Sequence, residues 1–92
     1  MRILVTPTFE RAVKKLHKQQ KVALDEAVRA IASQPDAGET KVGDLAGVHV
    51  YKFRMGTLLC LLAYRVLDEN RLKLLMVGPH ENFYRDLKRT EH

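Results

Sequence analysis

Three strand-like runs in the second half of the chain constrain its fold most, because only short turns separate them. The runs are Val48 to Arg54, Leu58 to Leu67 and Arg71 to Val77. The segments between them, Met55-Gly56-Thr57 and Asp68-Glu69-Asn70, are short enough for hairpins. The sequence therefore predicts a three-stranded antiparallel meander.

Alternation along these runs predicts which side chains share a face, because successive residues of a strand point in opposite directions. The first run divides into two groups: Val48, Val50, Lys52 and Arg54 on one face, and His49, Tyr51 and Phe53 on the other. One face therefore ends in positive charge. Leu58 to Ala63 is apolar on both faces, which predicts a central strand covered by helices on one side and by a partner on the other.

The N-terminal part of the chain predicts a strand followed by a helix. Arg2 to Val5 is a short apolar run, and Thr6 or Thr8 is expected to cap the helix that comes next. Apolar residues at helical spacing continue this helix to about Gln19. The other face of the helix is rich in Lys and Arg, which indicates a solvated surface in most proteins.

A second helix repeats the pattern from Leu24 to Ile31 and stops before Pro35. The connection Gln19-Gln20-Lys21 predicts an antiparallel helical hairpin. Pro35 to Gly47 is polar and rich in Gly, and it is expected to be a long loop. With a short helix after the third strand, the order becomes β-α-α-β-β-β-α, an α+β fold.

Length and charge indicate what such a fold binds. The 92 residues predict one domain spanning positions 1–92. Sixteen Lys and Arg against eleven Asp and Glu leave a net charge of +5, and the pI is about 9.6. A polyanion is therefore the first partner to consider, either a nucleic acid or an acidic protein segment.

Cysteine and histidine usage argues against a metal site and against secretion. The single cysteine, Cys60, lies in an apolar run, so a buried structural thiol is expected and an intrachain disulfide is impossible. The four histidines lack metal-ligand spacing: His17, His49, His80 and His92. We expect no metal and no cofactor. Neither a signal peptide nor a membrane span is evident, so a cytoplasmic protein without membrane contact is expected.

A candidate site follows the third strand of the meander, in the stretch from Gly78 to Arg85. If the residues after Pro79 enter a helix, His80 and Tyr84 stand four apart on one face and Arg85 is adjacent. Imidazole titrates near neutral pH, and a phenol and a guanidinium can orient or stabilise what it protonates. The alternative is structural: His80 caps the last helix, Tyr84 packs beneath it and Arg85 is solvated.

The order of elements and three sequence passages resemble the RelE/ParE superfamily of toxins from bacterial type II toxin–antitoxin modules. The passages are Asp44-Leu45-x-Gly47 with Val50-Tyr51-Lys52-x-Arg54, then Tyr64-Arg65-Val66, then Val77-Gly78-x-His80 with Tyr84 after it. The resemblance covers nearly the whole chain. It implies a curved antiparallel sheet with a helical hairpin on one face and a concave basic surface on the other, and it implies a cognate antitoxin.

The superfamily includes ribosome-dependent messenger RNA endonucleases and gyrase poisons, and site residues rather than the fold separate them. Four positions match the nuclease pattern: Lys52, Arg54, His80 and Tyr84. The resemblance thus implies cleavage of mRNA in the ribosomal A site by metal-free attack of a 2′-hydroxyl, with inhibition of translation. One departure is Leu61, which stands where the best-known nucleases carry an Arg, and Arg65 is the expected substitute.

Each of these residues has a role in the implied chemistry. Lys52 and Arg54 would clamp the scissile phosphate. His80 would act as general acid or base, and Tyr84 would stack on a base or orient the proton transfer. Further contacts with the RNA backbone are expected from the remaining basic residues: Arg65, Arg85, Lys88 and Arg89.

Two other functions and several structural roles remain open at this point. The chain is alternatively a ParE-like gyrase inhibitor that acts by binding, or an inactive homologue that binds only its antitoxin and operator DNA. Lys52 and Arg54 are alternatively a solvated strand face, Tyr84 a packing residue and Arg65 half of a surface salt bridge. The expected partners are the cognate antitoxin, the ribosome with its mRNA, and operator DNA through the toxin–antitoxin complex.

Overall fold

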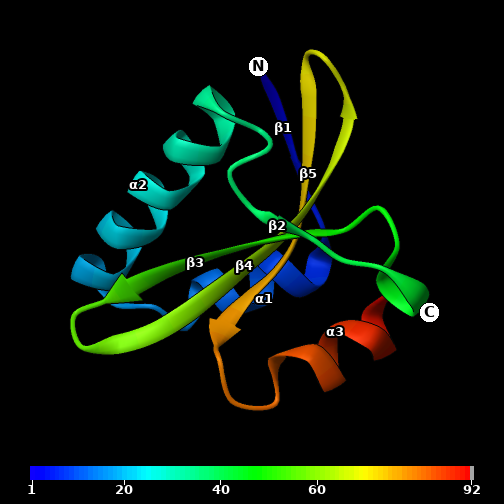
Figure 1. Cartoon of the computed structure of the whole chain (residues 1–92). Coiled ribbons are helices and arrows are strands. Elements are labelled where there is room, and N and C mark those ends of the chain that lie inside the picture. Colours follow the sequence, from blue (N-terminus) through cyan, green and yellow to red (C-terminus); the bar gives the residue numbers. More distant parts are fainter. Residues whose placement is uncertain (92) are drawn as a thin grey trace.

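The computed structural model describes residues 1–91, and His92, one of the four histidines considered above, lies outside the described residues. Five strands form a single sheet in the order β1-β5-β4-β3-β2, and three helices pack against it (Figure 1). The elements are β1 (Arg2–Val5), α1 (Pro7–Lys14), α2 (Lys18–Ser33), β2 (Glu39–Thr40), the 3₁₀ turn η1 (Gly43–Leu45), β3 (His49–Met55), β4 (Leu58–Asp68), β5 (Arg71–Pro79) and α3 (Phe83–Thr90).

The predicted antiparallel meander is confirmed by the pairing of β3 with β4 and of β4 with β5. The first strand, β1, joins the sheet parallel to β5 and forms one of its edges. Next to it β5 contains a bulge: Tyr64 pairs with Leu74 and Ala63 with Met76, so Leu75 is the extra residue.

Thr6 connects this bulge to the first helix. Its side-chain oxygen accepts a hydrogen bond from the Phe9 N–H at 3.0 Å, which caps α1 as predicted. The same hydroxyl donates to the carbonyl of Leu75, the extra residue of the bulge, at 2.7 Å. The Thr6 side chain therefore stabilises both the start of α1 and the bulge of β5.

The predicted junction of the two helices is wrong by several residues. We expected α1 to reach about Gln19, whereas it ends at Lys14 and α2 already begins at Lys18. The His17 N–H donates to Oε1 of Gln20 at 3.0 Å, which supports the first turn of α2. The stretch contains neither Pro nor Gly, so nothing in the local sequence marked the break.

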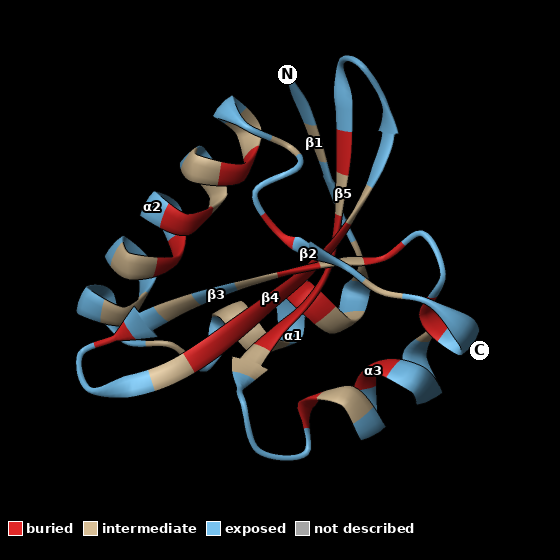
Figure 2. Ribbon diagram, viewed as in Figure 1, coloured by how far each residue is buried: buried red, intermediate tan, exposed pale blue. Residues whose placement is uncertain are grey.

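Both faces of the sheet are covered by the chain itself, and Figure 2 shows the buried residues concentrated along β4 and β5. On one face the helical hairpin packs Phe9, Leu24 and Ile31 against β4 and β5. On the opposite face, Phe83 and Leu87 of α3 pack with residues of β3, β4 and β5. The chain itself, through η1 and α3, therefore buries the apolar residues of this second face, and the expected partner is not needed to cover them.

Tyr64 of β4 holds the long loop onto the sheet. Its hydroxyl donates to the Pro35 carbonyl at 2.6 Å and accepts from the Gly38 N–H at 2.9 Å. A Cβ atom on Gly38 would lie 2.7 Å from this hydroxyl, so the approach requires glycine. The loop also supplies the short strand β2, which pairs with β3. In the described part of the chain, no helix is long and apolar enough to cross a membrane.

Candidate functional site

The turn between β5 and α3 brings His80 and Tyr84 together. Their ring centroids lie 6.4 Å apart with the planes at 88°, an edge-on contact. We predicted that a helix starting after Pro79 would bring the two rings together. This is wrong, because α3 begins only at Phe83. Instead the Phe83 N–H bonds to the His80 carbonyl at 3.3 Å, and Asn82 adopts a left-handed conformation with φ 62° before the helix starts. His80 is exposed and Tyr84 is half-buried, so a ligand can reach both.

The register of the sheet places Lys52 and Arg54 on the same face as this pair. Arg54 pairs with Leu59 of β4, whose carbonyl accepts the His80 N–H at 3.1 Å. Lys52 pairs with Leu61, which pairs with Gly78 of β5. Two strand spacings, about 10 Å, therefore separate each cation from the β5 side of the site. Both side chains are exposed, and the Arg54 guanidinium donates to the Thr57 carbonyl at 3.1 Å.

A lysine that the sequence analysis did not single out lies closer to Tyr84 than either of them. The Nζ of Lys41 is 4.8 Å from the centroid of the Tyr84 ring and 3.2 Å from Oε1 of Glu39. Polar contact with the Tyr84 side chain, and after it with Glu39, raises the pKa of Lys41 above its ordinary value, against a smaller opposing effect of burial. No sequence signal marked Lys41 or Glu39, because a two-residue strand is too short to show a pattern.

Glu39 adds a carboxylate to this face. It pairs in register with Val50, and it lines a cavity of about 240 Å³ together with Ala37, Val50, Tyr51 and Lys52. The face therefore combines an imidazole, a phenol, an acid and several cations. These groups can hold a phosphate and move a proton.

Arg65 is engaged in contacts within the protein. Its guanidinium donates to Oε1 of Glu91 at 3.0 Å and to the Ala46 carbonyl at 3.2 Å, so it connects the end of α3 to the loop after η1. A Cβ atom on Gly47 would lie 2.8 Å from this guanidinium, and the φ of Gly47 is +85°, so the position suits only glycine. Leu61, which occupies the position where the nuclease pattern has an Arg, is fully buried.

Helical geometry separates the three basic residues of α3 that we expected to bind RNA. Phe83 and Leu87 point into the core, and at 100° per residue Lys88 follows Tyr84 on one flank of the helix. Arg85 and Arg89 point away from the sheet, and Arg85 lies 3.6 Å from the Asp86 carboxylate. Of the three basic residues, only Lys88 therefore lies on the same side of α3 as Tyr84.

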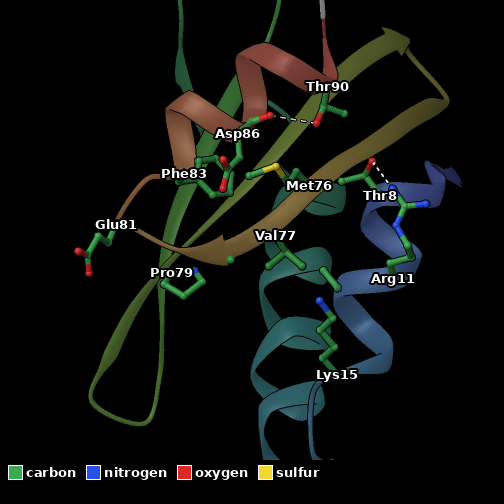
Figure 3. A pocket seen from close by; sticks show the side chains of 12 residues that line it. Thr8, Arg11, Lys15, Met76, Val77, Pro79, Glu81, Phe83, Asp86 and Thr90 are labelled. Atoms are coloured by element: carbon green, nitrogen blue, oxygen red, sulfur yellow. Dashed lines mark hydrogen bonds between the residues drawn. The ribbon is translucent and has the colours of Figure 1, made fainter.

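The opposite flank of α3 borders a separate cavity of about 300 Å³ between α1, β5 and α3 (Figure 3). The cavity is lined by two cations and two acids, together with Val77 of β5: Arg11 of α1, Lys15 just after α1, Glu81 before α3 and Asp86 in α3. None of the predicted site residues lines this cavity, so it is distinct from the His80–Tyr84 site.

Cys60 is a buried free cysteine. Burial raises the pKa of the Cys60 thiol, as expected for a structural cysteine. Among residues 1–91, no cluster of three His, Cys, Asp or Glu side chains is arranged to hold a metal ion.

The fold and the basic face together are those of toxins from type II bacterial toxin–antitoxin systems. The chain belongs to the ParE-like toxins of these systems, since the family's sequence model matches residues 3–88. No curated protein matches the sequence.

Solved structures show the same fold at low sequence identity. The toxin in the intact E. coli RelBE toxin–antitoxin complex superposes with a TM-score of 0.71 at 18% identity, over 87% of this chain and 96% of that one. The isolated E. coli RelE toxin gives 0.67 at 18% identity, over 96% of both chains. The archaeal RelE–RelB complex from Pyrococcus horikoshii gives 0.54 at 16% identity, over 87% of this chain and 94% of that one. The RelE-like fold is thereby established.

Proposed function

We propose that this toxin is a ribosome-dependent endoribonuclease that cleaves messenger RNA in the A site and so inhibits translation. The observation that supports this most is the edge-on contact of His80 with Tyr84, at 6.4 Å, on the face that also carries Lys52 and Arg54. An exposed imidazole beside a phenol, with cations about two strand spacings away, suits general acid–base cleavage of a phosphodiester.

In the proposed reaction the 2′-hydroxyl attacks the adjacent phosphorus, and the bond from phosphorus to the departing 5′-oxygen breaks. Lys52 and Arg54 stabilise the charge that develops on the phosphate oxygens. His80 either takes the proton from the 2′-hydroxyl or gives a proton to the departing 5′-oxygen, and water exchanges the proton at the other oxygen. Tyr84 stacks on a base or orients the transfer that His80 makes. Lys88, on the same flank of α3 as Tyr84, attracts the RNA backbone.

A second candidate is a gyrase inhibitor that acts by binding alone. The ParE-like family assignment favours it, and so does the engagement of Arg65, the expected substitute for the Arg missing at Leu61, with Glu91 and Ala46. In this candidate the basic face docks on a protein or DNA surface and performs no chemistry.

One pair of assays separates the two candidates. The purified toxin is added to an in vitro translation reaction, and the message is mapped by primer extension, while a parallel reaction measures supercoiling by gyrase. We expect cuts within codons of translated message and unchanged supercoiling. Intact message together with inhibited supercoiling would select the second candidate.

The first mutational prediction concerns His80. His80→Ala should lower the cleavage rate by roughly 100- to 10,000-fold, the usual contribution of a general acid or base. The matched control is Glu81→Ala, an exposed neighbour in the same turn, which should cleave normally. Circular dichroism confirms that both variants fold. Wild-type cleavage by a folded His80→Ala variant would exclude His80 from the chemistry.

We also propose that a cognate antitoxin neutralises this chain, as the two toxin–antitoxin complexes among its structural neighbours suggest. Because the protein is basic, the antitoxin segment that contacts it should be acidic. Copurification of the toxin with the product of an adjacent gene tests this proposal.

A further inference from the structure

Lys41 makes a contact that no other described lysine or arginine makes, because its ammonium lies against an aromatic ring of the candidate site. The Nζ is 4.8 Å from the Tyr84 ring centroid, well within cation–π range. The two residues come from distant parts of the chain: Lys41 directly follows β2, and Tyr84 lies in the first turn of α3.

The surroundings of Lys41 fix its position on both sides of the ammonium. Its backbone N–H donates to the Val48 carbonyl at 2.9 Å, which extends the pairing of β2 with β3. Its side chain is bonded to Glu39 at 3.2 Å and is only 21% exposed. Because these contacts raise the pKa of Lys41, the ammonium stays charged at every pH at which an RNA-cleaving site would work.

Tyr84 is bordered on three sides. His80 meets it edge-on at 6.4 Å, and Phe83 meets it edge-on at 5.7 Å. The Lys41 ammonium lies over a ring face. A nucleobase that stacks on Tyr84 therefore cannot use the side of the ring that Lys41 occupies.

We propose that Lys41 is a positioning residue for Tyr84: it holds the ring in one orientation beside His80 and restricts base stacking to a single ring face. This inference rests on the proposed RNA cleavage, since it assigns Tyr84 a substrate-facing role. Lys41 acts through Tyr84, and Lys52 and Arg54 remain the groups that contact phosphate.

The test compares two substitutions of Lys41 in single-turnover cleavage on programmed ribosomes. Lys41→Met keeps the length of the side chain and removes the charge, whereas Lys41→Arg keeps a cation that stacks on aromatic faces. We expect a roughly 2- to 30-fold lower rate constant for Lys41→Met, the range that a cation–π contact is worth. Lys41→Arg should recover most of the rate, and the toxin concentration for half-saturation should change little in either variant.

A double variant distinguishes positioning from direct phosphate binding. If Lys41 acts only through the ring, Lys41→Met should add no further loss to a Tyr84→Leu variant. Losses that multiply, or a Lys41→Met variant whose defect lies only in half-saturation, would overturn the proposal, because both results mean that the ammonium contacts RNA by itself.

A measurement without catalysis separates this proposal from the proposed function. In the proton NMR spectrum of the wild-type protein, the ring current of Tyr84 should shift the ε-methylene protons of Lys41 upfield, and Tyr84→Leu should abolish the shift. A wild-type protein that shows the upfield shift but cleaves no message keeps the contact and refutes the proposed function. A wild-type protein without the shift overturns the positioning role, whatever its activity.

Discussion

Tyr64 and Tyr84 show how the same side chain takes different roles according to its burial. Tyr64 is fully buried, and its hydroxyl is satisfied by the Pro35 carbonyl and the Gly38 N–H. Tyr84 is half-buried, with His80 and Lys41 against its ring. Tyr64 therefore stabilises the fold, and Tyr84 remains available to a ligand.

The phenol of Tyr64 should make stability depend on pH in the alkaline range. Burial raises the pKa of Tyr64 above its ordinary value of 10.0, with the Gly38 N–H opposing the shift. A raised folded-state pKa means that the stability from this group is complete below the unfolded pKa and is lost as pH rises through the folded pKa. We expect the free energy of unfolding to fall above pH 10 by up to about 1.4 kcal/mol per pH unit from this residue.

The variant that tests this expectation is Tyr64→Phe. It should lose about 1–3 kcal/mol at neutral pH, because the Pro35 carbonyl and the Gly38 N–H lose their partner. Its stability should also fall less steeply above pH 10 than that of the wild type, as urea unfolding at several pH values would show. Tyr51→Phe, in a half-buried strand position, serves as the control. Parallel alkaline profiles for wild type and Tyr64→Phe would contradict the assignment.

At the residue scale, sequence reasoning found what lay within one segment and missed what the fold brought together. His80 and Tyr84 are near neighbours in the chain, so their contact was predictable even though the turn was taken for a helix. Lys41 was missed because its partner, Tyr84, lies in another element. The salt bridge considered as an alternative role for Arg65 is present, but its partners Glu91 and Ala46 could not be named from the sequence because they lie far from Arg65 in the chain.

At the scale of elements, strands were easier to predict than helix boundaries. The three strands of the meander were placed to within about two residues, because apolar runs bounded by short turns indicate both their length and their pairing. The boundary between α1 and α2 was misplaced because both sides are rich in Lys and contain no Pro or Gly. The strand β2 escaped notice because its two residues are defined by pairing with β3 alone.

The start of α2 carries an electrostatic cost that a substitution can relieve. Lys18 is the first residue of α2, no acidic residue occupies the first turn, and the positive end of the helix dipole lies there. Lys18→Glu should therefore raise the free energy of unfolding by about 0.3–1 kcal/mol. Thermal unfolding at low salt measures the gain, and Lys18→Gln should show roughly half of it. A lower Tm for Lys18→Glu would contradict this account of the helix start.

At the scale of the whole molecule, the unfavourable position of Lys18 is part of a wider distribution of charge. A cavity of about 280 Å³ is lined by His17 and Gln20 of the helical hairpin and by Gly56 and Thr57 of the β3–β4 turn, so the two loops are neighbours. The exposed cations around the helix junction and on the neighbouring strand β3 are grouped as a basic rim: Lys14, Lys15, Lys18, Lys21, Arg54 and Lys52. Among the described residues, the side-chain ion pairs involve neither α1 nor α2.

The positive charges of the basic rim at the helix junction lack acidic partners within the described ion pairs, so a bound polyanion would stabilise them. Lys18→Gln should weaken the association of the toxin with ribosomes and should reduce the salt dependence of binding by about one unit of log K per log[salt]. The control is Arg29→Gln, an exposed cation near the other end of α2, about 16 Å along the helix axis, which should bind as the wild type does. Both variants lose one positive charge. If the basic rim contacts the ribosome, the slope of log K against log[salt] should differ between the two variants. Equal slopes would mean that net charge alone attracts the toxin to its target, and that the lysines at the helix junction are simply solvated.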